Sequence, residues 1–164
     1  SKAADITDLL YVAERPEGNL SVRLQSMIQR LGGVDYIAPA EDCMDLLPVT
    51  QSEWQKIMEK LIKTDEYTDI VLDLSELCQG LYYFLQAGNC IYSMCARTKE
   101  EQLAVEQYKK QLEKRQILGV LEKTKWMELQ REWIEKIGNI ERLAITPLGE
   151  YMKGLVDKDG NRPI

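Results

Sequence analysis

Asp73 is the residue whose type and setting best fit a chemical role. It follows the apolar run Ile70-Val71-Leu72, which is typical of a strand buried on both faces of a parallel sheet. Ligands of open α/β sheets bind beyond the carboxyl ends of the strands, and a carboxylate there can hold Mg²⁺ beside nucleotide phosphates. A second interpretation stays open, in which Asp73 only caps the turn or helix that follows.

Three further groups have suitable side chains but weaker patterns. Ser75 and Glu76 have the types of a nucleophile and its base, yet no third group that would orient them is evident. The acidic residues Glu41, Asp42 and Asp45 are expected to form a solvated loop rather than a cation site. The aromatic run 82–84 is expected to be the core and rim of a helix rather than a platform for stacking bases.

Composition excludes several classes of function. The chain has no histidine, which removes Ser-His and Cys-His catalysis and histidine-ligated metals. Its four cysteines form no C-x-x-C pair and lie among apolar neighbours, so reduced, buried thiols are expected. No signal peptide or membrane-length apolar run is seen, which favours a cytoplasmic protein.

Charge argues against nucleic acid as a partner. The formal net charge is −6, so DNA and anionic membranes are repelled on average. The basic residues of the stretch 109–115 are interleaved with Glu106 and Glu113. That pattern predicts a solvated helix face.

The elements that must position Asp73 alternate between helix and strand. Capping boxes at Thr50 with Glu53 and at Thr98 with Glu101 open two of the helices. The predicted helices cover 6–13, 20–31, 50–62, 79–87, 98–112 and 148–156. The predicted strands cover 34–38, 69–74 and 90–95, with a brief fourth at 143–146; the stretch 120–129 is either an extended edge segment or the start of a helix.

This alternation predicts a single α/β domain over 1–164, with three layers and a mainly parallel sheet flanked by helices. Asp73 is expected at the carboxyl edge of that sheet, and 157–164 as a loose polar tail. In the helix 50–62, one face is expected against the sheet and the other in solvent. The inward residues are Trp54, Ile57, Met58 and Leu61, and the outward ones Gln55, Lys56 and Lys60.

The order of four segments resembles MinD/ParA-like P-loop ATPases. The stretch 67–74 is similar to the family's D-Y-I-I-x-D strand, 80–85 to the helix after it, 89–94 to its A-D-x-I-x-V strand, and 33–40 to its G-L-x-V-L-P-A strand. The resemblance covers about residues 30–115 and, weakly, 148–156. It implies ATP- and Mg²⁺-dependent dimerisation that positions or partitions cellular cargo, with Asp73 as the magnesium-side acid and Ser75 and Glu76 in a loop near the phosphates.

Three departures change what this resemblance implies. No Gly-Lys dipeptide occurs anywhere, so the phosphate-binding loop of the family is missing. Asn89 stands where the family commonly has Asp, and no basic amphipathic helix of the membrane-targeting kind is seen near the C-terminus. We expect the C-terminal portion of such an ATPase, inactive by itself, with a protein partner or self-association. The alternative is a non-catalytic protein-interaction module on an ATPase-like scaffold.

Overall fold

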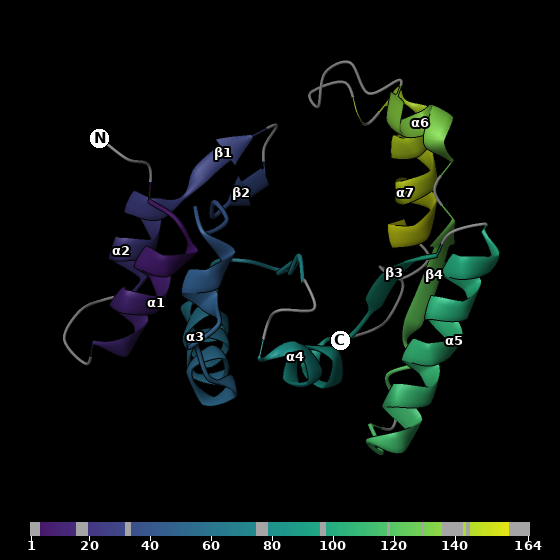
Figure 1. Ribbon diagram of the computed structural model, residues 1–164. Helices are drawn as coiled ribbons and strands as arrows, with labels where there is room; N and C mark the ends of the chain where they lie inside the picture. Colours follow the sequence, from purple (N-terminus) through teal and green to yellow (C-terminus); the bar gives the residue numbers. More distant parts are fainter. Residues whose placement is uncertain are drawn as a thin grey trace. The chain divides into compact units, whose positions relative to one another are not determined.

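The computed structural model describes residues 4–15, 20–31, 34–74, 79–95, 98–117, 119–128, 130–135, 143 and 145–157. These residues are mixed α/β, with helices and two small two-stranded sheets. They divide into two compact units, 1–88 and 89–164 (Figure 1). The single domain expected over 1–164 stays a prediction.

Unit 1 is built on a cluster of helices. Its elements are α1 (Ile6–Glu14), α2 (Leu20–Met27), the short 3₁₀ helix η1 (Cys43–Leu46), α3 (Gln51–Thr64) and α4 (Leu81–Ala87). Asp5 begins α1 by accepting a hydrogen bond from the N–H of Thr7 at 2.8 Å. The predicted capping box of α3 is confirmed, because Thr50 and Glu53 each accept a hydrogen bond from the other's backbone N–H.

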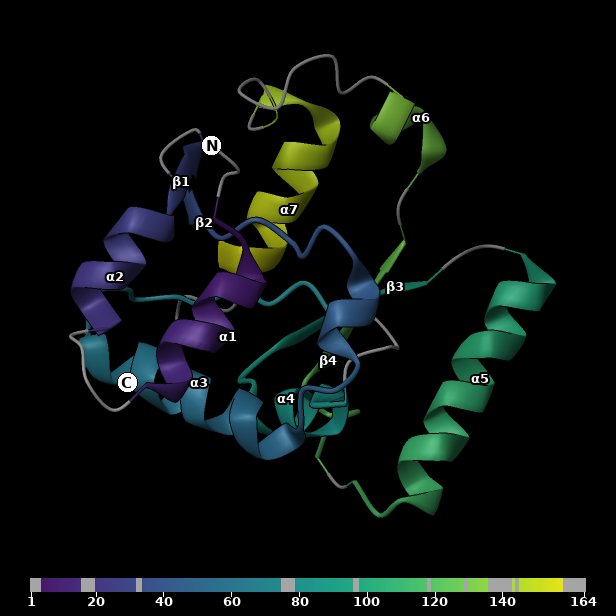
Figure 2. The ribbon, with the colours of Figure 1, turned by 60° about the vertical axis from the view of Figure 1, so that its left-hand side comes forward.

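Helices α1, α2 and α3 pack against one another, as Figures 1 and 2 show. The buried core of unit 1 consists of Leu9, Ala13, Leu24, Met27, Trp54, Ile57 and Phe84. The predicted inward face of α3 is confirmed: Trp54 and Ile57 are buried, and Met58 and Leu61 pack partly buried against the core. Its neighbours, however, are helices. The expectation that this face covers a sheet is wrong, since α3 contacts α1 and α2.

A short hairpin takes the place of the end of a predicted helix. Helix α2 ends at Met27, and β1 (Gln29–Leu31) pairs antiparallel with β2 (Val34–Tyr36). The prediction of a helix through residue 31 is therefore wrong, and β2 is a strand as predicted but in an antiparallel pair. A salt bridge of 2.6 Å between Arg30 and Asp35, which face each other across the hairpin, stabilises this pairing.

Residues 69–74 form no strand, contrary to the prediction. Figure 1 shows the stretch as coil between α3 and α4, and no strand among the described residues pairs with it. A strand is stable only when a neighbour satisfies its backbone groups. Asp73 accordingly does not lie at the carboxyl edge of a sheet formed by the described residues.

Unit 2 contains a parallel β-α-β arrangement. Strand β3 (Ile91–Cys95) pairs in parallel with β4 (Thr124–Glu128), with Ser93 opposite Trp126. The crossover between them is α5 (Lys99–Lys114), followed by α6 (Arg131–Glu135) and α7 (Pro147–Asp157). The predicted strand 90–95 and closing helix are confirmed, and the stretch 120–129 proves to contain a strand. Of the brief strand predicted at 143–146, the described residues 143, 145 and 146 are not extended.

The buried residues of unit 2 lie on α5, β4 and α7 and on the segment leading into β4. Leu112 and Val120 are fully buried, and the Thr124 hydroxyl donates to the Val120 carbonyl at 2.7 Å. Leu103, on α5, is exposed. No helix within the described ranges is long and apolar enough to cross a membrane.

Candidate functional site

Asp73 lies exposed on the segment between α3 and α4. Ser75 and Glu76 lie outside the described residues, so the loop predicted beside the phosphates is described only at its ends, Leu74 and Gln79. Gln79 donates through Nε2 to the Leu47 carbonyl at 2.5 Å, which ties the far end of this loop to the residues after η1.

The part of the chain that is described does not form a complete binding site for Mg²⁺ and ATP. No group of three or more His, Cys, Asp or Glu side chains is close enough there to hold a metal ion. Asp73 offers a single carboxylate in an exposed position, whereas Mg²⁺ in nucleotide sites is held by protein oxygens together with substrate phosphates. The described residues alone do not fit this cofactor pair.

Asp73 belongs to a stretch of unusual composition, residues 65–74, which we name the acidic segment. It contains four carboxylates, at positions 65, 66, 69 and 73, and no lysine or arginine. Between the last two carboxylates, Ile70 is 39% exposed, Val71 91% and Leu72 41%. Apolar side chains of this size are usually buried, so these three consecutive residues form an exposed apolar patch.

Both ends of the acidic segment are attached to unit 1. Tyr67 and Leu74 pack against the helical core. The Tyr67 hydroxyl also donates to Asp35 Oδ2 at 3.2 Å, while Arg30 donates to both oxygens of the same carboxylate at 2.6 and 3.1 Å. The middle of the segment is therefore exposed between two fixed ends.

This network shifts the protonation equilibria of its members. The hydrogen bond from Arg30 holds the pKa of Asp35 below its usual value. Partial burial raises the pKa of Tyr67, and the neighbouring Asp35 carboxylate raises it further. Asp35 is thus a stable acceptor near neutral pH.

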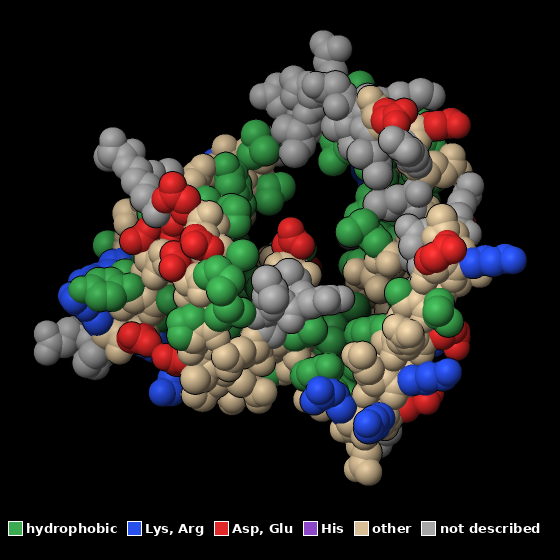
Figure 3. All heavy atoms as spheres, viewed as in Figure 1, with side chains coloured by type: hydrophobic (Ala, Val, Ile, Leu, Met, Phe, Trp, Pro, Cys, Tyr) green, Lys and Arg blue, Asp and Glu red, His purple; other side chains and the backbone are tan. Residues whose placement is uncertain are grey.

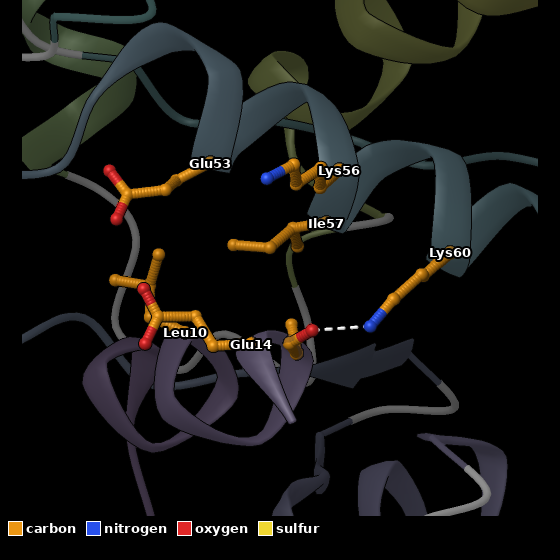
Figure 4. Close-up of a pocket in the computed structure, with 7 residues that line it drawn as sticks. Leu10, Glu14, Glu53, Lys56, Ile57 and Lys60 are labelled. Atoms are coloured by element: carbon orange, nitrogen blue, oxygen red, sulfur yellow. Dashed lines mark hydrogen bonds between the residues drawn. The ribbon is translucent and has the colours of Figure 1, made fainter. Parts of the chain in front are cut away.

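A cavity of about 330 Å³ lies between α1 and α3. Figure 4 shows the Glu14 and Glu53 carboxylates towards one end of it and the Lys60 ammonium group towards the other. Its lining residues are Leu10, Ala13, Glu14, Glu53, Lys56, Ile57 and Lys60. None of the predicted site residues is among them.

Two of the charged groups in this cavity have structural partners. Lys60 donates to the Ala13 carbonyl near the C-terminal end of α1, which explains why this residue is half-buried rather than solvent-facing as predicted. Glu53 accepts the Thr50 N–H at 2.6 Å and its hydroxyl at 2.5 Å, and these bonds lower the pKa of Glu53. Both groups stabilise helix ends. The cavity is therefore a groove between two helices in which these two charged groups are already engaged in structural hydrogen bonds.

The remaining predicted features are ordinary surface or core. The acidic residues 41, 42 and 45 are exposed, and Asp42 caps η1 by accepting the Met44 N–H at 2.9 Å. Phe84 is buried while Tyr82 and Tyr83 are half-buried, as predicted. Cys43 is exposed, so the expectation of a buried thiol is wrong there.

The basic residues of α5 lie on a mixed surface. Figure 3 shows lysine and acidic side chains interleaved along this helix. Lys109 lies 3.4 Å from Glu106 and also stacks over the Trp126 ring, 5.3 Å from its centroid. This agrees with the expected solvated face and gives no continuous basic patch on the helix.

The sequence singled out residues 69–74, but as a buried strand, and it did not show how the segment is held. The hydrogen bond that joins Tyr67 to Asp35 spans residues far apart in the chain, and no local pattern announces it. The only signal was the tyrosine directly before a run of acidic and apolar residues. No protein-family model, curated protein or solved structure matches the chain.

Proposed function

We propose that this chain forms the C-terminal portion of a cytoplasmic MinD/ParA-like ATPase that positions or partitions cellular cargo. The observation that carries the proposal is the parallel arrangement β3–α5–β4. It begins at the segment that resembles the family's A-D-x-I-x-V strand, and parallel strands joined by a helix are the building unit of nucleotide-binding α/β folds.

In the whole protein we propose a three-layer fold with a mainly parallel sheet flanked by helices. The β3–β4 pair would be part of that sheet, and the acidic segment would supply a further strand once a neighbouring strand is present. The apolar sequence of residues 70–72 and their exposure support this assignment, because an apolar β-forming run is stabilised by pairing and burial.

Asp73 is the proposed magnesium-side acid of the whole protein, with Ser75 and Glu76 near the phosphates. The bound Mg²⁺ would neutralise charge on the phosphates during hydrolysis. The chain contains no Gly-Lys dipeptide, and the backbone N–H groups and lysine of a phosphate-binding loop supply most of the affinity for phosphate. The 164-residue chain alone is therefore expected to bind no ATP at millimolar Mg²⁺.

The reading frame that encodes the chain provides the first test. A G-K-G-G-x-G-K-[ST]-like stretch before Ser1 supports the ATPase. In the protein made from that frame, Asp73→Asn should lower Mg²⁺-dependent ATP hydrolysis at least about 100-fold, by analogy with other charge-stabilising groups. Asp69→Asn, on the same exposed segment, is the matched control and should retain activity. Equal effects of the two substitutions would contradict the assignment of Asp73.

A second candidate is a non-catalytic interaction module on the same scaffold. The exposure of Val71, between apolar neighbours in the acidic segment, favours it. A reading frame without a phosphate-binding loop, together with no nucleotide affinity in calorimetry, would support this candidate. Micromolar ATP affinity of the 164-residue chain would contradict it.

A further inference from the structure

We infer that residues 69–73 are a docking strand for a separate partner protein, whose extended segment has an apolar centre and a basic residue at each end. The inference rests on the interaction-module candidate, because in the sheet of the proposed ATPase the same residues would already be paired, and it requires no nucleotide. It rests on the fixed ends, the exposed apolar centre and the charge of the acidic segment.

The backbone of this stretch has the attachments that strand addition needs. Tyr67 and Leu74 are held against the core of unit 1, so ordering the residues between them costs less conformational entropy than ordering a free loop. Within the described part of the chain, no backbone hydrogen bond joins residues 69–74 to another segment. An incoming strand can satisfy such N–H and C=O groups.

The side chains favour a β partner. Isoleucine and valine are among the strongest strand formers, and exposure alternates along the stretch, with Val71 far more exposed than Ile70 or Leu72. In a strand, successive side chains point to opposite faces, which produces this alternation in exposure. As a strand, the stretch would present Asp69, Val71 and Asp73 on one face.

The negative charge of the acidic segment determines which kind of partner strand it prefers. The acidic segment has four carboxylates and no basic residue, so a second copy of the chain would bring acid against acid. Like charges in facing strand positions are destabilising, whereas opposite charges stabilise the pair. A partner strand with lysine or arginine is therefore preferred over self-pairing.

The spacing of the two aspartates defines the partner further. Asp69 and Asp73 are four residues apart, which is about 13 Å along a strand. Residues directly opposite them in a partner strand lie on the same face and are also four apart. The complementary segment is basic-Φ-Φ-Φ-basic, where Φ is an apolar, β-forming residue.

A pair of labelled peptides tests this inference with the 164-residue chain. The basic probe is acetyl-Gly-Lys-Ile-Val-Leu-Lys-Gly-amide, and the matched acidic probe has glutamate in place of both lysines. Fluorescence anisotropy without nucleotide should give at least about tenfold tighter binding of the basic probe, as expected for two facing charge pairs. Equal binding of the two probes, or no binding of either, would overturn the inference.

Charge reversal separates specific pairing from general attraction. Asp69→Lys with Asp73→Lys should invert the preference, so that the acidic probe binds more tightly. Glu41→Lys with Glu59→Lys changes the net charge equally at exposed positions outside the acidic segment and should leave the preference unchanged. Inversion by both double variants would overturn the inference, because it would show that net charge alone decides.

A backbone variant tests the strand itself. Val71→Pro removes one N–H and cannot sit in a paired central position, so it should weaken the basic probe about tenfold or more. Val71→Thr keeps a β-branched side chain and should bind as the unmodified chain does. Sedimentation without peptide adds a further outcome: dimerisation that Val71→Pro abolishes would overturn the assignment to a separate partner.

Discussion

The acidic segment and β3 both contain residues expected to form a strand, but they differ in their pairing. Ile70-Val71-Leu72 and Ile91-Tyr92-Ser93 both have the composition of strands, and both were predicted as strands of one parallel sheet. Strand β3 pairs with β4, which follows it after the crossover helix α5. The acidic segment pairs with no strand in the described residues. An apolar, β-forming sequence alone therefore does not make a strand, because a neighbouring strand must be available to pair with it.

The stability of the core of unit 1 should not depend on whether residues 69–74 are paired as a strand. Trp54 is buried and its ring meets that of Phe84 edge-on, with centroids 5.7 Å apart. Trp54→Ala should lower the free energy of unfolding by about 3–5 kcal/mol, measured in denaturant melts by far-UV circular dichroism. If unit 1 depended on a strand at 69–74 instead of its helices, the loss would fall below about 1 kcal/mol.

Trp54→Phe is the control for that variant. The buried Nε1 of Trp54 has no hydrogen-bond partner among the described residues, so losing this N–H removes no bond seen there. The phenyl ring retains much of the packing, and the loss should be clearly smaller than for alanine.

A matched pair of substitutions compares the two stretches directly. Met127 in β4 is buried and Val71 in the acidic segment is exposed. Met127→Ala should cost about 2–4 kcal/mol, whereas Val71→Ala should change stability by no more than about 0.5 kcal/mol. Thermal or denaturant unfolding followed by circular dichroism measures both. A similar cost for the two would mean that residues 69–74 are packed in solution.

Gly80 limits how α4 approaches the core after the acidic segment. A Cβ placed on this buried residue would lie 2.8 Å from Trp54 Cδ1 and 3.0 Å from Phe84 Cε2. Gly80→Ala should therefore cost about 1–3 kcal/mol through overpacking. Gly154→Ala, on α7 with no atom within 4 Å of the added Cβ, is the control and should be neutral or slightly stabilising. Equal effects would contradict the close packing at Gly80.

The smallest expected effect is a change in stability with pH. It comes from Asp35, which accepts the hydrogen bond from Tyr67 of the acidic segment. Its folded-state pKa is lowered by the hydrogen bond from Arg30, so its stabilising contribution is present above the unfolded pKa of about 3.9 and is lost as pH falls below it. The stability difference between the unmodified chain and Asp35→Asn should thus be constant above about pH 5 and shrink towards zero in acid. A difference that grows on acidification would contradict this network.

Local patterns predicted the helices well because their signals are local. The capping box at Thr50 and the apolar stripe from Trp54 to Leu61 determine where α3 begins and which face it buries. The pairing of strands depends on distant segments, and this is where prediction failed: residues 29–31 became β1 because 34–36 offered a partner, and 69–74 remained unpaired among the described residues.

The candidate site was predictable only in part, for the same reason. Sequence indicated Asp73 at the end of an apolar run, but its distance from a sheet edge depends on strands that must pair with that run. The role of Tyr67 could not be predicted either. Its hydrogen bond to Asp35 depends on the hairpin, which lies partly where a helix was predicted. The cavity between α1 and α3 arises from tertiary packing and has no local signal.

Amide hydrogen exchange of the 164-residue chain, resolved by NMR, tests most directly whether residues 69–73 are an unpaired strand awaiting a partner. Without peptide, the hydrogen-bonded amides of β3 should exchange at least about tenfold more slowly than those of residues 70–73, after correction for intrinsic rates. A saturating concentration of the basic probe should then slow amide exchange at residues 70–73 and leave the exchange rates of β3 unchanged. Protection of residues 70–73 before peptide is added, or no change on its addition, would contradict the account.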